Sequence, residues 1–220
     1  MFFCSSLFGD SIQWYNGDPN LEDGLRQDVN GMSPGLTYDN FVVGPGGVDV
    51  SGLFSDDFMN ASISQAYWEI RSGVSAGDGG VVVASGTSPA LQMDLGLIAF
   101  GFEVYRIEVD GLSIHLPPGT YWMTVAPDLS GTTASSFVTT TSGTNGIGNP
   151  QAQDGNSYFN SSFYGADFAL PSDFIATQTS DGGHLDFSEG VLGLASPVPE
   201  PGTIGLALGG LLLVLGKRRR

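Results

Sequence analysis

Apolar and polar side chains alternate with a period of two residues along several short stretches of this chain. The alternation is clearest in residues 65–73, 102–111 and 119–127. Successive side chains of a β-strand point to opposite faces, so each stretch predicts a strand with one buried face. The apolar side chains expected on these faces are Trp68 and Ile70, then Tyr105, Ile107 and Val109, and finally Tyr121, Met123 and Val125.

Further strands are predicted from apolar runs that end at glycine. Residues 37–43, TYDNFVV, are followed by GPGG, and residues 184–194 form an expected last strand that returns the chain to the core. Residues 79–86, GGVVVASG, predict a short buried strand whose Val81 and Val83 join the core.

Two long segments are rich in turn-forming residues. Residues 14–35 contain Asn-Gly and Asp-Gly pairs that mark tight turns, and residues 130–161 are mostly Ser, Thr, Asn and Gly. The second segment is expected to be a long irregular loop, or short strands joined by turns. Since no convincing helical period appears, the pattern predicts an all-β fold, an antiparallel β-sandwich or jelly roll, with a single apolar helix at the C-terminus.

The chain is expected to hold one domain between two terminal segments. One domain is the default for 220 residues, and we place it at residues 14–195. Residues 1–13 are interpreted as the remnant of a signal peptide whose start would lie upstream, because they begin with a short apolar run and have no basic n-region. Residues 196–220 form a distinct tail.

Composition agrees with a β-rich body and excludes several classes of function. The chain has 33 glycines and only 14% charged residues, a mixture that favours turns and strands over long surface helices. Acidic residues outnumber basic ones 23 to 7, and phosphate backbones would repel such a body, so no nucleic-acid partner is expected. Cys4 is the single cysteine, which excludes an intramolecular disulfide and a cysteine-based zinc site.

The tail joins two prolines, an uncharged apolar run and a basic end. As a helix, residues 204–215 would span about 18 Å, less than the bilayer core of about 30 Å. The basic end would stay at the cytoplasmic face and leave the body outside, while Pro199 and Pro201 hold the junction extended and accessible. The apolar side chains are Ile204, Leu206, Leu208, Leu211, Leu212, Leu213, Val214 and Leu215, and the basic end is Lys217, Arg218, Arg219 and Arg220.

This tail resembles a known sorting signal. The motif at residues 198–203, with Val198, Pro199, Glu200 and Pro201, precedes a leucine-rich run and KRRR, in the order found in the PEP-CTERM signal of exopolysaccharide-producing Gram-negative bacteria. Some ice-binding proteins also end in such a tail. The resemblance implies export by the general secretory route, transient membrane anchoring, recognition by an exosortase and cleavage near the motif. A permanent membrane anchor and a helix docked on the body are the alternatives.

The body carries a more scattered resemblance to the same class. WYNGD, YDNF, GTYWMTV and GNSYFNSSFYGADF are similar to phrases in uncharacterised PEP-CTERM proteins with β-sandwich bodies. This resemblance implies the fold and no particular activity.

No catalytic motif has the context that its chemistry needs. The pattern G-x-S-x-G occurs around Ser33 and Ser75, but Pro34 removes a backbone N–H needed for an oxyanion hole, and no helix is predicted after Ser75. His115 and His184 lie far apart in the sequence, and the His184-x-Asp186 pair is expected to be a surface contact. No spacing singles out a pair of catalytic carboxylates. We therefore predict no catalytic residue and no enzymatic activity.

Calcium is the alternative to an expectation of no cofactor. Asp18, Asn20 and Glu22 alternate as in the first half of an EF-hand loop, but Asp23 stands where the loop needs glycine and Val29 where it needs glutamate. An EF-hand is therefore rejected. A looser calcium site near residues 18–23, or around Asp78, stays open.

Aromatic side chains suggest sugar binding, because flat rings cover the apolar faces of pyranoses. Core packing is nevertheless the default expectation for most of these residues. Trp122 points away from Tyr121 and Met123, so one of the two faces there is expected to be exposed. The candidate rings are Trp14, Tyr15, Trp68, Tyr121 and Trp122.

The function expected from the sequence is that of an exported protein of the cell surface or exopolysaccharide matrix, with a structural, adhesive or glycan-binding role. Its expected partners are an exosortase, extracellular polysaccharide, and the membrane through the C-terminal helix. The alternatives are an extracellular hydrolase that acts on polysaccharide, and a surface protein that stays anchored in the membrane.

Overall fold

The computed structural model describes residues 11–150, 154–175 and 185–195. These residues form an all-β body in which the helical structure is one 3₁₀ turn, Pro171–Asp173. The strands are β1 (Ser11–Tyr15), β2 (Pro19–Arg26), β3 (Leu36–Val43), β4 (Val48–Met59), β5 (Gln65–Ser72), β6 (Val81–Ala99), β7 (Phe102–Leu116), β8 (Gly119–Pro127), β9 (Ser136–Thr141), β10 (Tyr158–Ser161), β11 (Ala166–Ala169) and β12 (Glu189–Ala195). The all-β prediction is confirmed.

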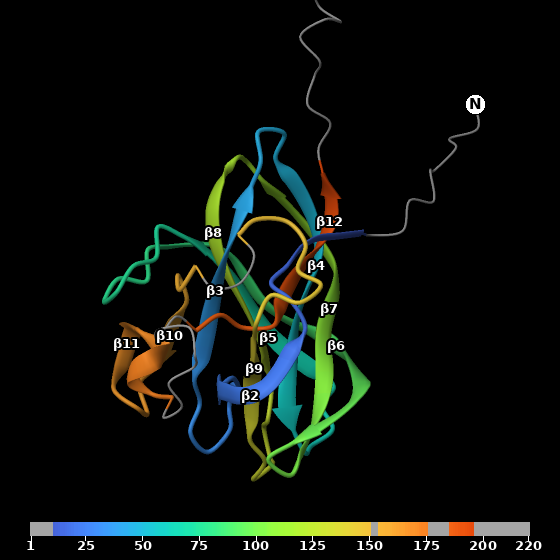
Figure 1. Ribbon diagram of the computed structural model, residues 1–220, viewed down its shortest axis with the longest axis vertical. Coiled ribbons are helices and arrows are strands. Elements are labelled where there is room, and N and C mark those ends of the chain that lie inside the picture. The colour runs from blue at the N-terminus through green and yellow to red at the C-terminus, as the bar shows by residue number, and fades with distance from the viewer. Residues whose placement is uncertain (1–10, 151–153, 176–184, 196–220) are drawn as a thin grey trace, which may run out of the picture.

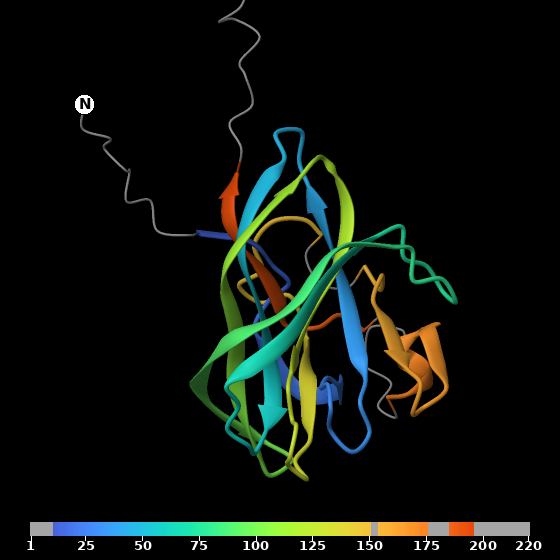
Figure 2. The ribbon, with the colours of Figure 1, turned by 180° about the vertical axis from the view of Figure 1, so that it is seen from behind.

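The strands pair antiparallel in one sheet that curls on itself (Figures 1 and 2). Its order is β1-β12-β4-β7-β6-β5-β8-β3-β10-β11, and β9 pairs with β2 and with β4. The two halves share β6, whose residues 81–89 pair with β5 and whose residues 90–99 pair with β7. Pro89 stands at this change of partner, where a residue without an N–H is tolerated.

The main core lies between the two halves of the curled sheet. Leu53 on β4 and Ile107 on β7 are fully buried from one side, and Ile70 on β5 and Met123 on β8 from the other. Each of these strands faces the core with alternate residues, as the hydrophobic period requires. The predicted buried faces of residues 65–73, 102–111 and 119–127 are therefore confirmed, with Tyr105 only partly buried.

The valines of residues 79–86 do not join the core, and that prediction is wrong. Val81 is 66% exposed and Val83 is 41% exposed. Residues 81 and 82 pair with the last residues of β5, where the β5–β6 hairpin projects from the body as the arm at the left of Figure 1. Val81, Val82 and Val83 are exposed there, whereas Val74 on the same hairpin is buried in a small cluster with Trp122 and Phe168.

Strands also occur in segments for which turns or loops were expected. The turn-rich residues 14–35 contain β2 and the end of β1, and residues 130–161 contain β9 and β10. Of the two structures expected for residues 130–161, the second is therefore the one observed, short strands joined by turns. β10 and β11 extend the sheet beyond β3 and stand beside the body in Figure 1, where they enclose a smaller core of Leu25, Val138, Phe159, Ala166, Ile175, Leu185 and Phe187.

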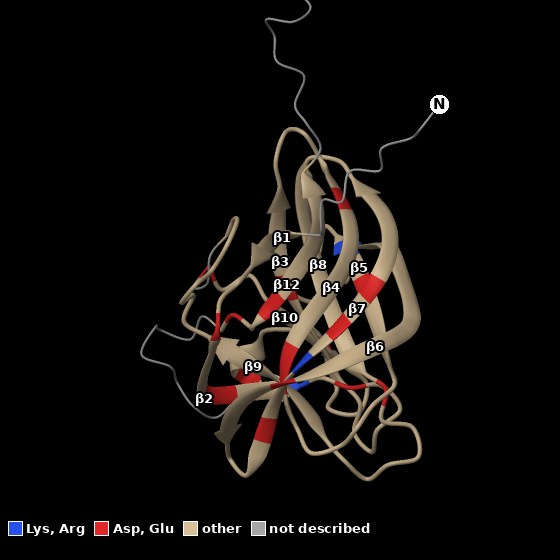
Figure 3. Cartoon of the chain, turned by 90° about the vertical axis from the view of Figure 1, so that its right-hand side faces the viewer, with Lys and Arg blue, Asp and Glu red and all other residues tan. Residues whose placement is uncertain are grey.

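Acidic positions are spread over several strands, with few basic positions among them (Figure 3). Among the described residues, no helix is long and apolar enough to cross a membrane. The predicted sorting motif, apolar helix and basic end lie in residues 196–220, outside the described residues.

Candidate functional site

The aromatic rings that were considered for sugar binding are all buried. Trp14 is 2% exposed and Trp122 is 6% exposed. These two tryptophans each donate the indole N–H to a backbone carbonyl 2.8 Å away, Trp14 to Pro150 and Trp122 to Asn156, and Trp68 donates to the Ser88 hydroxyl at 3.0 Å. The expectation of an exposed face at Trp122 is wrong, because Tyr158 and the chain before β10 cover that face. Core packing is the role of these rings.

The two places considered for calcium hold their oxygens in protein hydrogen bonds. Asp18 accepts the Tyr15 hydroxyl at 3.0 Å and the Asn145 amide at 2.7 Å. Asn20 Oδ1 accepts the Thr140 hydroxyl, and Asp78 accepts the backbone N–H of Gly80 inside a turn. Calcium binding at either place stays a prediction.

The serine and histidine motifs are not assembled into a catalytic arrangement within the described residues. Ser75 is exposed and its backbone bridges to Asp78 at the tip of the projecting hairpin. Ser33 lies in the connection between β2 and β3. His115 Nδ1 lies 2.7 Å from Asp49 Oδ1, with both side chains 61% exposed, and His184 lies outside the described residues.

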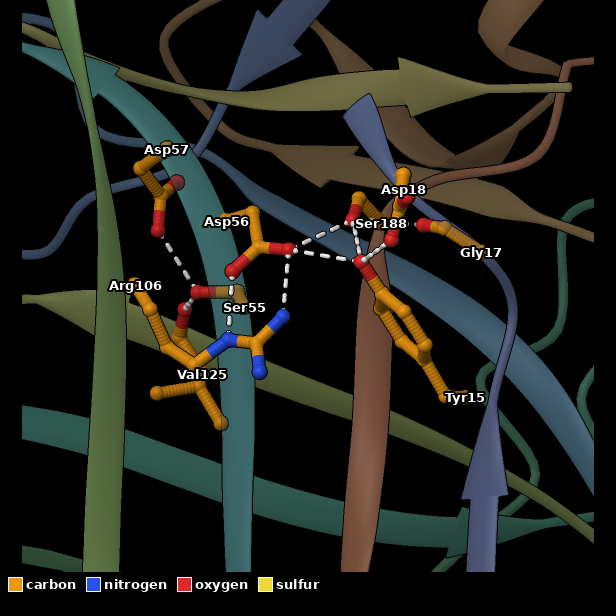
Figure 4. Close-up of polar contacts among 9 residues, drawn as sticks. All are labelled: Tyr15, Gly17, Asp18, Ser55, Asp56, Asp57, Arg106, Val125 and Ser188. Carbon is orange, nitrogen blue, oxygen red and sulfur yellow. Dashed lines mark hydrogen bonds and ion pairs between the residues drawn. The ribbon is translucent and has the colours of Figure 1, made fainter. Parts of the chain in front are cut away.

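A buried polar network joins β1, β4, β7 and the residue before β12 (Figure 4). Asp56 accepts two bonds from Arg106 and one from the Tyr15 hydroxyl at 3.1 Å, and the Ser188 hydroxyl donates to it at 2.8 Å. Burial, together with the Asp56 charge, raises the pKa of Tyr15 far above its usual range. The tyrosine therefore stays protonated as a hydrogen-bond donor, and the network ties strands together.

A groove lined by aromatic side chains lies beside β2 and β9. It consists of two adjoining hollows of about 200 and 140 Å³ that share Gly24 and Phe137. β2 and β9 lie at the lower centre of Figure 1, with β10 and β11 at the left. We call this the aromatic groove; its lining residues are Asp23, Gly24, Leu25, Arg26, Phe58, Phe100, Phe102, Phe137, Phe159, Tyr164 and Phe174.

The aromatic groove has buried rings in its floor and exposed rings at its rim. Phe58 is 2% exposed and Phe159 is 1% exposed, whereas Phe100 at one end is 67% exposed and Tyr164 at the other is 44% exposed. Phe100 meets Phe58 edge to face with ring centroids 5.6 Å apart. The rings at the rim are thus partly exposed while they contact the buried rings of the floor.

Phe100 is held in a backbone conformation that is rare for its type. It forms, with Gly101, the two-residue turn between β6 and β7, and the φ angles of the two residues are 55° and 82°. Positive φ at both positions fits the right-handed twist of the hairpin, but it is an outlier for a bulky side chain. Such a conformation costs on the order of 1–2 kcal/mol relative to glycine. The turn therefore presents a phenylalanine where glycine or asparagine would be favoured.

Gly24 lets β2 lie close to the ring that forms the floor. A Cβ atom at Gly24 would lie 2.9 Å from a ring carbon of Phe58 and 3.0 Å from the carbonyl of Val138. Real Cβ atoms do not approach so closely, so any other residue would push β2 away from the groove.

The aromatic groove shows little charge to solvent. Arg26 stacks over Phe137 at 5.3 Å, is 5% exposed, and forms an ion pair with Asp28. Burial raises the pKa of Asp28 to about 6, against the pull of Arg26. Asp23 lies beside Gly24 as the carboxylate of the lining. The groove is therefore lined mainly by aromatic rings, with few polar groups among them.

Sequence reasoning missed the aromatic groove because its rings come from four separated parts of the chain. Phe100, Phe137, Phe159 and Phe174 lie in different elements or loops, and only the fold brings them together. The one local signal is FGF at residues 100–102, where a bulky residue takes a turn position that usually holds asparagine or glycine.

Comparisons with known proteins give a distant likeness of shape. No model of a known protein family matches the chain, and no curated protein matches it. Among solved structures, it is similar to the cysteine protease and lectin-like domains of Cwp84, a surface layer associated protein of Clostridium difficile, with 14% identity and a TM-score of 0.42. The match covers 72% of this chain and 31% of that chain, so this chain corresponds to less than a third of that structure.

Proposed function

We propose that this protein is an exported protein of the cell surface or exopolysaccharide matrix that binds polysaccharide in the aromatic groove. It acts by binding, and its body is a β-rich scaffold that presents the groove. The observation that carries the proposal is Phe100, a ring that is 67% exposed and is held at positive φ at the groove's end. Strain of this kind persists where the surrounding structure imposes it, and it clusters at sites of function.

The chemistry of the aromatic groove fits sugars. The faces of Phe100, Tyr164 and Phe174 are open in part, and flat rings pack against the apolar C–H faces of pyranoses. Two adjoining hollows along one groove suit a chain of several sugar units better than a single one. Asp23 supplies an acceptor for sugar hydroxyl groups.

The net charge of −16 favours neutral glycans over acidic ones. No free arginine or lysine lines the groove among the described residues, since Arg26 is paired with Asp28. A chain of uronic acids would therefore meet like charge without compensation. We expect the ligand to be an uncharged stretch of polysaccharide.

Delivery to the surface is assigned to residues 196–220. The resemblance of this tail to the PEP-CTERM signal supports export, transient anchoring through residues 204–215, and release by an exosortase. The short apolar run supports release over permanent anchoring, because a bilayer core of about 30 Å needs about 20 apolar residues.

The test is a glycan array probed with the purified chain and two variants. Wild-type protein should bind neutral polysaccharides, and Phe100→Gly should weaken that binding roughly tenfold, the effect of about 1.4 kcal/mol of lost ring contact. Val81→Ala is the matched control, because Val81 is 66% exposed on the projecting hairpin, away from the groove. No binding by the wild type, or full affinity in Phe100→Gly, would reject the proposal.

A further inference from the structure

Three carboxylates from separate parts of the chain converge at β3, away from the aromatic groove. Asp39 lies on β3, Asp154 precedes β10, and Asp186 precedes β12. One oxygen of each lies within 4.8 Å of one oxygen of each of the others. Two oxygens bound to the same Ca²⁺ are at most about 5 Å apart, since each Ca–O bond is 2.3–2.6 Å. The spacing thus suits a shared cation.

Asp39 is a buried charge with no basic partner. It is 0% exposed, and its oxygens accept the Asn16 amide at 2.8 Å and the backbone N–H groups of Phe187 and Asn40 at 2.7 and 2.8 Å. Burial and the nearby Asp186 raise the pKa of Asp39 well above its usual range. The basic side chains of the described residues pair elsewhere, Arg26 with Asp28, Arg71 with Glu69, Arg106 with Asp56 and His115 with Asp49.

Two buried amides at the same place have an oxygen with no donor. Asn16 is 1% exposed and Asn40 is 3% exposed, and the Oδ1 atoms of both lack a hydrogen-bond partner among the described residues. The Nδ2 atoms of these amides donate to the cluster itself, Asn16 to Asp39 at 2.8 Å and Asn40 to Asp154 at 3.0 Å. Burying a polar oxygen without a hydrogen-bond partner costs folding free energy, and a cation bound by that oxygen would offset this cost.

We propose that Asp39, Asp154 and Asp186 bind one Ca²⁺ ion, with the amide oxygens of Asn16 and Asn40 as further ligands. A side-chain amide can turn its oxygen toward the ion by a half rotation that exchanges Oδ1 and Nδ2. The ligands are carboxylate and amide oxygens, with no nitrogen or sulfur donor among them, which matches a hard cation. Five protein oxygens with room for solvent at Asp154, which is exposed, suit the six to eight oxygens that Ca²⁺ takes.

The ion would fasten the long connection between β9 and β10 to the body. This connection already contacts β1 and β3, where Ile147 exchanges backbone hydrogen bonds with Tyr15, and the Asn149 carbonyl accepts the N–H of Val42 at 2.7 Å. Asp154 lies near its end. Binding at Asp154 would therefore add a contact where the connection turns back toward β10.

The test measures Ca²⁺ binding to the full chain by equilibrium dialysis and thermal melting after chelation. Extracellular calcium modules bind with Kd of about 10⁻⁴–10⁻³ M, so calcium is varied up to about 10 mM. We expect one ion per chain, and a melting temperature that rises by roughly 5–10 °C once calcium is about 100-fold above Kd. Magnesium at the same concentration should give a smaller rise, because it demands a rigid octahedral site.

Asp154→Asn is the decisive variant, because the side chain is exposed and the amide can still accept the Asn156 N–H. It should fold without calcium and bind the ion at least about tenfold more weakly. Asp167→Asn, an equal loss of charge at an exposed position on β11, should bind like the wild type. A wild type that binds no calcium at about 10 mM, or an Asp154→Asn that binds as tightly, would overturn the site; a protonated Asp39 would then explain its burial.

Discussion

Arg106 and Asp56 form a two-pronged ion pair inside the sheet, with Nε 2.7 Å from Oδ1 and Nη2 2.9 Å from Oδ2. The guanidinium also lies 4.0 Å above the ring of Phe54. Asp56 is fully buried, and the side chain of Arg106 is 19% exposed. This pair therefore holds β4 to β7 through charge, at a position where the two residues lie directly opposite each other in the sheet.

Removing the arginine should destabilise the protein strongly. Arg106→Leu leaves the buried Asp56 carboxylate without its cation, a change that typically costs about 3–5 kcal/mol of unfolding free energy. Urea denaturation of the wild type and the variant measures this change in unfolding free energy. Asp49→Asn breaks the exposed pair with His115 and should change stability by no more than about 0.5 kcal/mol. Equal effects of the two substitutions would contradict the structural role of the buried pair.

Truncation of Phe58 should cost far more stability than truncation of Phe100, although their rings touch. Phe100→Gly relieves the positive φ and loses one ring contact, so the unfolding free energy should change by less than about 1 kcal/mol. Phe58→Ala empties the groove floor and should cost about 3–5 kcal/mol. Denaturant titration of both variants measures these changes in unfolding free energy. A large loss of unfolding free energy in Phe100→Gly would show that this ring serves stability instead of binding.

A methyl group at Gly24 should deform the aromatic groove. Gly24→Ala places a Cβ atom against Phe58 and the Val138 carbonyl, and overpacking of this kind costs about 1–3 kcal/mol. Gly44→Ala is the control, because its Cβ would meet no atom within 4 Å. The melting temperature should fall in the first variant only, and sugar binding should weaken with it.

Asp128 should contribute to stability only above its titration range. Hydrogen bonds from Ser130, with others from Asn30 and Gln65, lower the pKa of Asp128 to about 2. The folded state therefore favours the charged form of Asp128 more strongly than the unfolded chain does. The contribution of Asp128 to the unfolding free energy is thus complete above about pH 4 and is lost as the pH falls toward 2. The stability difference between wild type and Asp128→Asn should shrink across that window. A difference that is constant from pH 5 to pH 2 would contradict this assignment.

Mass spectrometry of the exported protein should show a shortened C-terminus. If an exosortase releases the tail, the secreted chain ends before Ile204 and lacks residues 204–220. The matched control is Pro199→Ala with Pro201→Ala, which removes the motif and should leave the tail attached. An exported wild type that keeps Arg220 would support a permanent anchor instead.

Much of the fold was predictable because strand alternation is local, and the exceptions are polar residues in the core. β4 is the clearest case: Asp56 and Asp57 are both 0% exposed, so the strand shows no apolar period through its buried half. Conversely, Val81 to Val83 look buried by hydropathy but lie on a hairpin that extends past the core. Alternation reports which face a residue takes, and whether another layer covers that face depends on distant strands.

The candidate site could not be predicted in the same way. The rings that the sequence offered as candidates for sugar contact include Trp14 and Trp122, which donate to backbone carbonyls and are buried, as the core-packing alternative expected. The exposed rings are phenylalanines and a tyrosine that β-strand propensity alone would explain. The binding role proposed for them rests on exposure at the groove's rim, which is a property of the folded arrangement and has no local pattern beyond the unusual turn residue at Phe100.

The position of β12 sets an order on the assembly of the protein. Residues 189–195 pair with β1 on one side and β4 on the other, so the strand nearest the end of the body fills a place beside the strand nearest its beginning. Until that last strand has emerged from a ribosome or a translocation channel, β1 lacks its neighbour and β4 has an open edge. The nascent chain therefore cannot close its sheet early, and its open strand edges need shielding until synthesis is complete.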